Sequence, residues 1–202
     1  MKLYHGTTKK GLLGIKKTNK IKSSGIEMPE TMDVLLDRTN AAMNSLDYLP
    51  KSAGTSQPAA LGVGIYAFAS KHQACSFTSE HYVVTIDIGD GVDVYDLDNS
   101  DSIRNLALSL LSGDVADAIK NKIFDGEMIR QYRTICVQFA DYLVDLADSS
   151  ADLEDYPYIF AYSLWIIQQF SNENIQVVAR TFGNEPKYFC IQDDSVIQSI
   201  AV

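Results

Sequence analysis

The stretch LGVGIYAFASKHQACSFTSEHYVVTIDIGD, residues 61–90, determines how the first part of the chain folds. Its glycine turn leads into a short apolar run at 65–68, which predicts a strand. Ser70 is a suitable N-cap for a helix that we expect to end near Ser79. The alternating run 81–88 is the clearest strand pattern in the chain, and Gly89 and Gly91 end it. This stretch therefore predicts strand, helix and strand in succession.

Further strands are expected at both ends of the chain. Residues 2–5 form a short strand pattern, and Thr8 can cap a helix that runs to about Ile15. Residues 92–97 alternate as a second short strand after the clear one. Near the C-terminus, the runs 175–182 and 187–192 flank a Gly-Asn turn and predict a hairpin, which a last strand at 196–202 follows.

The middle of the chain differs from both ends. Between residues 100 and 172, apolar residues recur at helical spacing, with a break at Gly113, and Trp165 falls in the most apolar helix. Residues 25–60 mix short helical stretches with Pro, Gly and Ser, which is typical of a long surface connection. The chain therefore predicts one α+β domain over 1–202, with a helical insertion at about 100–172, and not alternating βαβ units.

The overall composition restricts the class of protein. The chain has 202 residues, of which 46% are hydrophobic and 21% charged, a balance too apolar for disorder. No apolar run approaches the roughly 18 residues that a membrane span needs, and the polar start lacks the apolar core of a signal peptide. Three scattered cysteines argue against a disulfide framework and a zinc site. We expect a protein that acts in a cytoplasm, its own or that of a target cell, without membrane contact.

Positive charge is concentrated at the start of the chain. Residues 1–26 contain seven lysines and no acid, whereas the other residues carry 10 basic and 26 acidic groups, or −16. Such a segment is either an ordinary solvated face or a surface that attracts an anionic ligand locally. The acidic remainder of the chain repels long polyanions such as nucleic acid.

Two short motifs contain candidate ligand-binding residues. His5 follows a strand and precedes Gly6, and a glycine lets a ligand approach the backbone closely. Tyr66 follows the Gly62-x-Gly64 turn, and its flat ring can stack on a planar heterocycle. The turn itself lacks the third glycine and the βαβ setting of a dinucleotide-binding fingerprint. A residue of either kind, taken alone, more often has a purely structural role.

The combination of these motifs resembles the ADP-ribosyltransferase superfamily. The order is Leu3-Tyr4-His5-Gly6-Thr7, then Gly62-Val-Gly64-Ile65-Tyr66, then a helix with Gln73-Ala74-x-x-Phe77, then a strong strand. It is most similar to the His–Tyr–Glu branch, which includes diphtheria toxin, the poly(ADP-ribose) polymerases and small bacterial and phage transferases. The likeness covers residues 1–90 and, less fully, 173–202. It implies a split, mostly antiparallel sheet and transfer of ADP-ribose from NAD⁺ to a macromolecule, more readily a protein than a nucleic acid, without a metal.

The resemblance also implies a role for each matching residue. His5 would hydrogen-bond a ribose hydroxyl of NAD⁺, and Gly6 would present its backbone to the nicotinamide carboxamide. Tyr66 and Phe77 would hold the nicotinamide ring between them. Thr7 would offer its hydroxyl to the ribose and phosphate side.

The third residue of the family pattern, a carboxylate near the start of a late strand, has two candidates. Glu185 lies in the predicted turn and is the acid that we favour. Matching Asp193 and Ile197 to the family strand instead places Tyr188 in that position, where it would contact the cofactor. In that case the protein would bind NAD⁺ or ADP-ribose, or a protein partner, without efficient transfer. RNA 2′-phosphotransferases share a similar start, but Arg180 and Lys187 are the only basic residues after position 172, which disfavours an RNA-end pocket.

Overall fold

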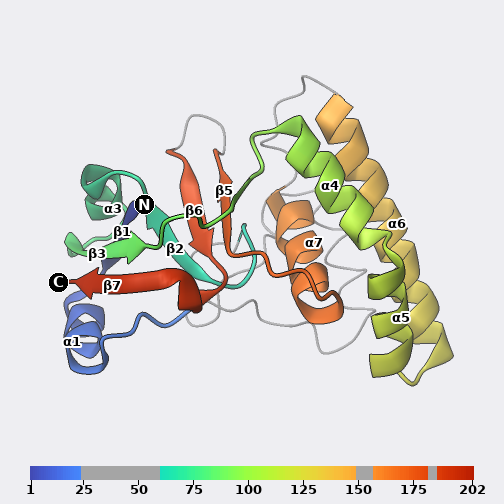
Figure 1. The fold of residues 1–202 in the computed structure, drawn as a ribbon, viewed down its shortest axis with the longest axis horizontal. Coiled ribbons are helices and arrows are strands. Elements are labelled where there is room, and N and C mark those ends of the chain that lie inside the picture. The colour runs from blue at the N-terminus through green and yellow to red at the C-terminus, as the bar shows by residue number, and fades with distance from the viewer. Residues whose placement is uncertain (24–59, 149–156, 182–185) are drawn as a thin grey trace.

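The computed structural model describes residues 1–23, 60–148, 157–181 and 186–202, and it has a mixed α+β fold. Within these residues, seven strands form one sheet in the order β4-β5-β6-β2-β1-β3-β7, and every neighbouring pair is antiparallel except β4 and β5 (Figure 1). The strands are β1 (Lys2–Thr7), β2 (Ile65–Phe68), β3 (Tyr82–Ile88), β4 (Val94–Asp96), β5 (Val177–Arg180), β6 (Tyr188–Ile191) and β7 (Ile197–Ala201). The expected α+β class and mostly antiparallel sheet are confirmed.

The stretch 61–90 folds as its pattern predicts. It forms β2, then α3 (Lys71–Ser76), then β3. Helix α3 ends three residues before the expected Ser79 because the chain must turn back to pair with β1, and His81 makes that turn with a left-handed φ of 58°. The expected connection 25–60 lies almost entirely outside the described residues.

The sheet consists of two well-paired halves that meet at a narrow seam. Strand β1 forms six register pairs with β3, and β2 forms four with β6, but β1 and β2 share only the pair Tyr4 and Phe68. Beyond that pair, residues 5–7 of β1 are in register with β3 alone. The sheet therefore opens between β1 and β2 on the side where His5 and Gly6 lie.

The predicted insertion forms four helices, α4 (Ser100–Leu110), α5 (Gly113–Lys122), α6 (Gly126–Asp148) and α7 (Pro157–Phe170). Side chains of Asn99 and Ser112 cap α4 and α5, which explains the break predicted at Gly113. Residues 159–167 of α7 are all buried, since this helix lies between the sheet and the other three (Figure 1). In the described part of the chain, no helix has both the length and the apolar character needed to cross a membrane.

Each face of the sheet contributes to a different hydrophobic core. One core joins the helices α4 to α7, including the predicted Trp165, to Val178 and Cys190 on the sheet. The other contains Leu3, Ile86 and further side chains of the opposite face. Because one core is shared by the helices and the sheet, the helical segment is an integral part of the domain and not an appendage.

Candidate functional site

His5 bridges the seam where the sheet opens. Its imidazole Nδ1 lies 2.7 Å from the main-chain oxygen of Tyr66. A carbonyl oxygen can only accept, so Nδ1 carries the proton and donates it. The neutral ring then has an acceptor at Nε2, and no hydrogen bond from the described residues engages that atom. His5 thus replaces a missing backbone hydrogen bond between β1 and β2, and its Nε2 has no hydrogen-bond partner among the described residues.

The environment of His5 favours its uncharged form. Burial lowers its pKa below the usual 6.5, and the hydrogen bond to the Tyr66 carbonyl offsets this only in part. The imidazole is therefore neutral near pH 7, as an acceptor at Nε2 requires.

This pKa shift predicts a pH-dependent contribution to stability. The unfolded chain binds a proton at His5 near pH 6.5, whereas the folded chain does so only at lower pH. The contribution of His5 to the free energy of unfolding should therefore be constant well above that value and should fall as the pH drops through it. Urea unfolding between pH 8 and 5 should show a smaller decline for His5→Asn than for the wild type, and equal slopes would contradict the assignment.

Gly6 provides the close approach between β1 and α3. A Cβ atom at this position would lie 2.2 Å from the Ala74 carbonyl oxygen and 2.9 Å from the Thr78 methyl group. Only glycine lets the helix pack this closely on the strand. Since Phe77 is the C-cap of α3, this contact also places that aromatic ring beside the seam.

Tyr66 is anchored to the turn that precedes it. Its hydroxyl accepts a hydrogen bond from the Leu61 N–H (2.9 Å) and donates one to the Gly62 carbonyl (2.8 Å). Burial raises the pKa of this phenol well above 10, and the nearby Cys190 adds to the shift. The turn packs tightly on β6, because a Cβ at Gly64 would lie 2.5 Å from the Cys190 sulfur. The hydroxyl is therefore occupied within the protein, and the ring packs against the core that the helices share with the sheet.

Three aromatic rings cluster next to the seam. The ring centroids of Phe77 and Tyr188 each lie 5.1 Å from that of Phe68, and 5.8 Å from each other. Phe77 is 36% exposed. The structure thus brings together two predicted contact residues around Phe68, which the sequence reasoning missed. Its position two residues after Tyr66 on the same face of β2 was the available signal.

The predicted hydroxyl and carboxylate candidates have different outcomes. Thr7 ends β1, and its hydroxyl lies toward Gly11 of α1 (Lys9–Thr18). Thr8 caps that helix as predicted, accepting from the Gly11 N–H at 3.2 Å. Glu185 lies outside the described residues. Tyr188 is the first residue of β6 and pairs with Phe68 on the side of β2 away from β1, and its ring contacts Phe77.

A charged cluster adjoins Tyr188. Asp98 accepts hydrogen bonds from the Thr181 N–H (2.7 Å) and hydroxyl (2.9 Å), and it pairs with Lys187 at 2.9 Å. Lys187 also reaches Asp96 at 2.6 Å. Although partial burial alone would raise the pKa of Asp98, these hydrogen bonds lower it below its usual value. The cluster ties the ends of β4, β5 and β6 together on both sides of residues 182–185. No spacing in the sequence indicates this cluster.

No group of three or more His, Cys, Asp or Glu side chains in the described ranges is arranged to hold a metal ion. Comparisons with protein-family models, with curated proteins and with solved structures found no match to this chain. Any function must therefore be argued from the geometry of the seam and from the sequence motifs that line it.

Proposed function

We propose that the protein is a mono-ADP-ribosyltransferase that binds NAD⁺ at the seam between β1 and β2. One observation carries this proposal, the hydrogen bond from His5 to the Tyr66 carbonyl across the point where the sheet opens. This hydrogen bond joins His5 and Tyr66, the first two members of the His–Tyr–Glu pattern. It leaves Nε2 of the imidazole as the acceptor for a sugar hydroxyl. The rings of Phe77 and Tyr188 contact each other edge to face beside Phe68, and a flat heterocycle would bind against this aromatic cluster.

The chemistry that this site would perform breaks one bond and forms another. The electron pair of the bond between the ribose carbon and the nicotinamide nitrogen leaves with neutral nicotinamide. Positive charge develops on the ribose, so a carboxylate beside it stabilises the transition state. An acceptor oxygen or nitrogen then bonds to the ribose carbon and gives its proton to that carboxylate or to water. His5 orients the sugar, and the aromatic rings hold the leaving group flat.

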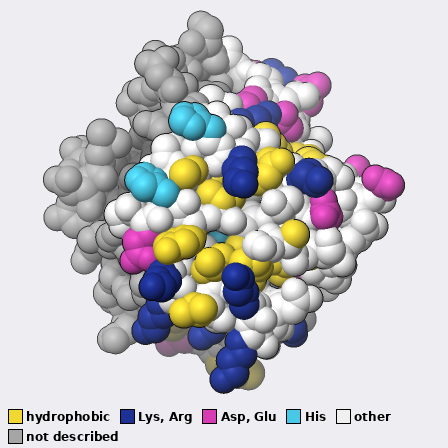
Figure 2. Space-filling view, turned by 90° about the vertical axis from the view of Figure 1, so that its left-hand side faces the viewer, with side chains coloured by type: hydrophobic (Ala, Val, Ile, Leu, Met, Phe, Trp, Pro, Cys, Tyr) yellow, Lys and Arg dark blue, Asp and Glu magenta, His cyan; other side chains and the backbone are white. Residues whose placement is uncertain are grey.

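The lysines at the start of the chain support an anionic substrate. All seven lysines between residues 1 and 22 are exposed. Of these seven, only Lys2 forms an ion pair with a described residue, Asp87. Figure 2 shows lysine side chains gathered around hydrophobic ones on the end of the molecule that contains α1, β1 and β3. This local charge favours the pyrophosphate of NAD⁺. The acidic remainder of the chain favours a protein acceptor over a long nucleic acid.

The test is incubation of the protein with NAD⁺ labelled in its adenylate half, with and without a cell lysate. We expect release of free nicotinamide and transfer of label to a macromolecule. Absence of both, at a protein concentration where NAD⁺ binds, would exclude the transferase proposal.

A second candidate function is a module that binds NAD⁺ or ADP-ribose without transfer. It is favoured by Tyr188, which packs on Phe68 and Phe77 at the strand position where the family pattern has its carboxylate.

Variants of Glu185 and Tyr188 separate these two functions. For a transferase, Glu185→Gln should lower nicotinamide release by about 100-fold or more, with NAD⁺ affinity nearly unchanged, because the lost carboxylate acts mainly in the transition state. Tyr188→Phe keeps the ring and should change the rate less than about threefold. A non-catalytic module should show calorimetric NAD⁺ binding in all three proteins and nicotinamide release in none.

A further inference from the structure

The turn before β2 is held by three side chains. The Leu61 carbonyl accepts from Gln192 Nε2 at 2.9 Å, the Gly62 carbonyl from the Tyr66 hydroxyl at 2.8 Å, and the Val63 carbonyl from Gln168 Nε2 at 3.1 Å. Three consecutive carbonyls are thus bound, two of them by glutamines from distant parts of the chain and one by the nearby Tyr66. The turn cannot satisfy them by forming a helix or a sheet ladder of its own.

Burial makes these hydrogen bonds necessary. Leu61 is fully buried, and Gly62 has a positive φ of 79°. A Cβ at Gly62 would lie 3.2 Å from Gln192 Nε2 and 3.3 Å from Leu164 Cβ. A carbonyl that loses its donor in this partly buried turn loses part of its hydrogen bonding, which favours a shift of the backbone toward another partner.

Gln168 is the one of these donors that comes from the helical segment. It lies in the last turn of α7, which packs on both the sheet and the outer helices. From Val63 the chain enters β2, where the Tyr66 hydroxyl donates back to the turn and the Tyr66 carbonyl accepts from His5. A continuous path therefore runs from α7 through the turn and Tyr66 to His5.

We propose that Gln168 is a positioning residue. Through it, the helical segment determines where the His5 ring lies and which of its two nitrogens carries the proton. Residues 100–172 are then required for the geometry of the site and do more than add stability. The effect on NAD⁺ binding rests on the proposed function, but the effect on His5 does not.

The primary test is Gln168→Met, which removes the donor and keeps the length of the side chain. The ¹⁵N signals of the wild-type His5 imidazole should show the tautomer protonated at Nδ1, and the variant should show a mixture of tautomers. Its affinity for NAD⁺ should fall about tenfold, or about 1.4 kcal/mol. The matched control is Gln169→Met, since this neighbour on α7 is exposed, and both readouts should match the wild type.

If Gln168→Met does not fold, Gln168→Glu provides the same test. Its carboxylate cannot donate to the Val63 carbonyl, whereas the protonated acid can, so the His5 signals should depart from those of the wild type only above the pKa of the new group. His5 signals that stay identical to wild type in either folded variant would overturn the positioning role. Altered His5 signals without any NAD⁺ binding, in wild type or variant, would instead contradict the proposed function.

Discussion

Replacing Gly6 by alanine is expected to destabilise the protein by roughly 3 kcal/mol, at the upper end of the usual cost of overpacking. The added methyl group would lie 2.2 Å from the Ala74 carbonyl oxygen, which belongs to the backbone of α3 and cannot rotate away. Either α3 must separate from β1 or β1 must separate from β3. Urea unfolding followed by circular dichroism should show a midpoint lower by about 1 M or more. Displacement of α3 would also move Phe77, so NAD⁺ binding should be lost even where the variant still folds.

Gly14→Ala is the matched control for this change. Gly14 lies within α1, and a Cβ there would meet no atom within 4 Å. The same substitution should therefore stabilise the protein by about 0.5–1 kcal/mol, because alanine restricts the unfolded chain and favours the helix. Opposite signs for the two variants are the expected result. A Gly6→Ala midpoint equal to that of the wild type would show that α3 is not packed on β1 as described.

Local patterns were sufficient to predict most of the fold. The alternation of 81–88 predicted β3 to within one residue, and the Gly-Asn turn predicted the antiparallel pairing of β5 with β6. Helical spacing likewise predicted that residues 100–172 are mainly helical, with a break at Gly113, where α5 begins. The position of α7 was not predictable in this way, because its apolar residues show that it is buried but not against which surface. Its contact with the sheet depends on packing between segments about 100 residues apart, such as Gln168 and Val63.

The candidate site was predictable as a set of residues but not as an arrangement. The order of motifs indicated that His5 and Tyr66 belong together, and they are joined by a hydrogen bond across 61 residues. The sequence could not show that the Tyr66 hydroxyl binds its own turn, since nothing in the Gly62-x-Gly64 pattern specifies where those carbonyls point. The ion pairs of Lys187 with Asp96 and Asp98 were missed for a similar reason, because β4 meets β5 only in the folded sheet.

Substitution of His5 should strongly lower the proposed activity, and two replacements can separate its two roles. In His5→Asn, the side-chain amide nitrogen reaches about as far as Nδ1 and can still donate to the Tyr66 carbonyl, but nothing replaces Nε2. This variant should therefore remain nearly as stable as the wild type at pH 8 while nicotinamide release falls about 100-fold, or about 2.7 kcal/mol. His5→Ala loses both contacts, so it should be equally inactive and also less stable by about 1–3 kcal/mol, because the Tyr66 carbonyl loses its donor.

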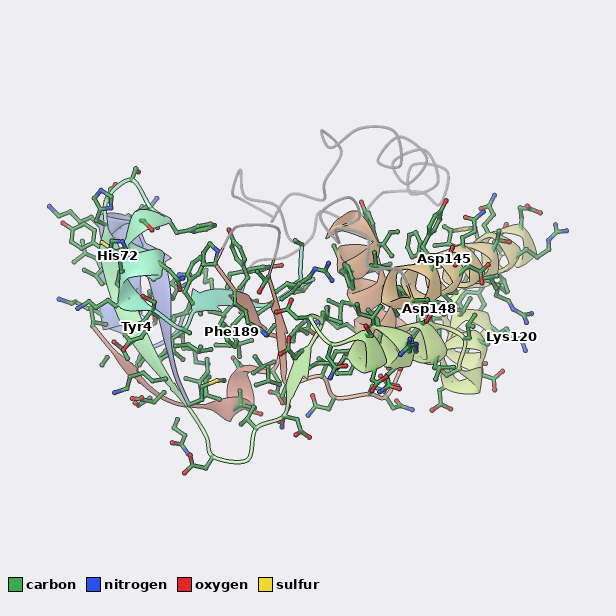
Figure 3. All side chains as sticks on the ribbon, turned by 90° about the horizontal axis from the view of Figure 1, so that it is seen from above. Tyr4, His72, Lys120, Asp145, Asp148 and Phe189 are labelled. Carbon is green, nitrogen blue, oxygen red and sulfur yellow. The ribbon has the colours of Figure 1, made fainter. Side chains whose placement is uncertain are left out.

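His72→Ala is the control that tests whether the loss of another imidazole also lowers stability or nicotinamide release. His72 is exposed on α3, at the end of the molecule away from the helical segment (Figure 3), and the same measurements should stay within about twofold of the wild type. If His5→Asn kept full activity, Nε2 would have no part in binding the sugar and His5 would serve only to close the seam. If His5→Asn were instead as unstable as His5→Ala, the donor to Tyr66 would depend on the ring itself. Only stability near that of the wild type combined with lost turnover supports an imidazole that holds the sheet with one nitrogen and the substrate with the other.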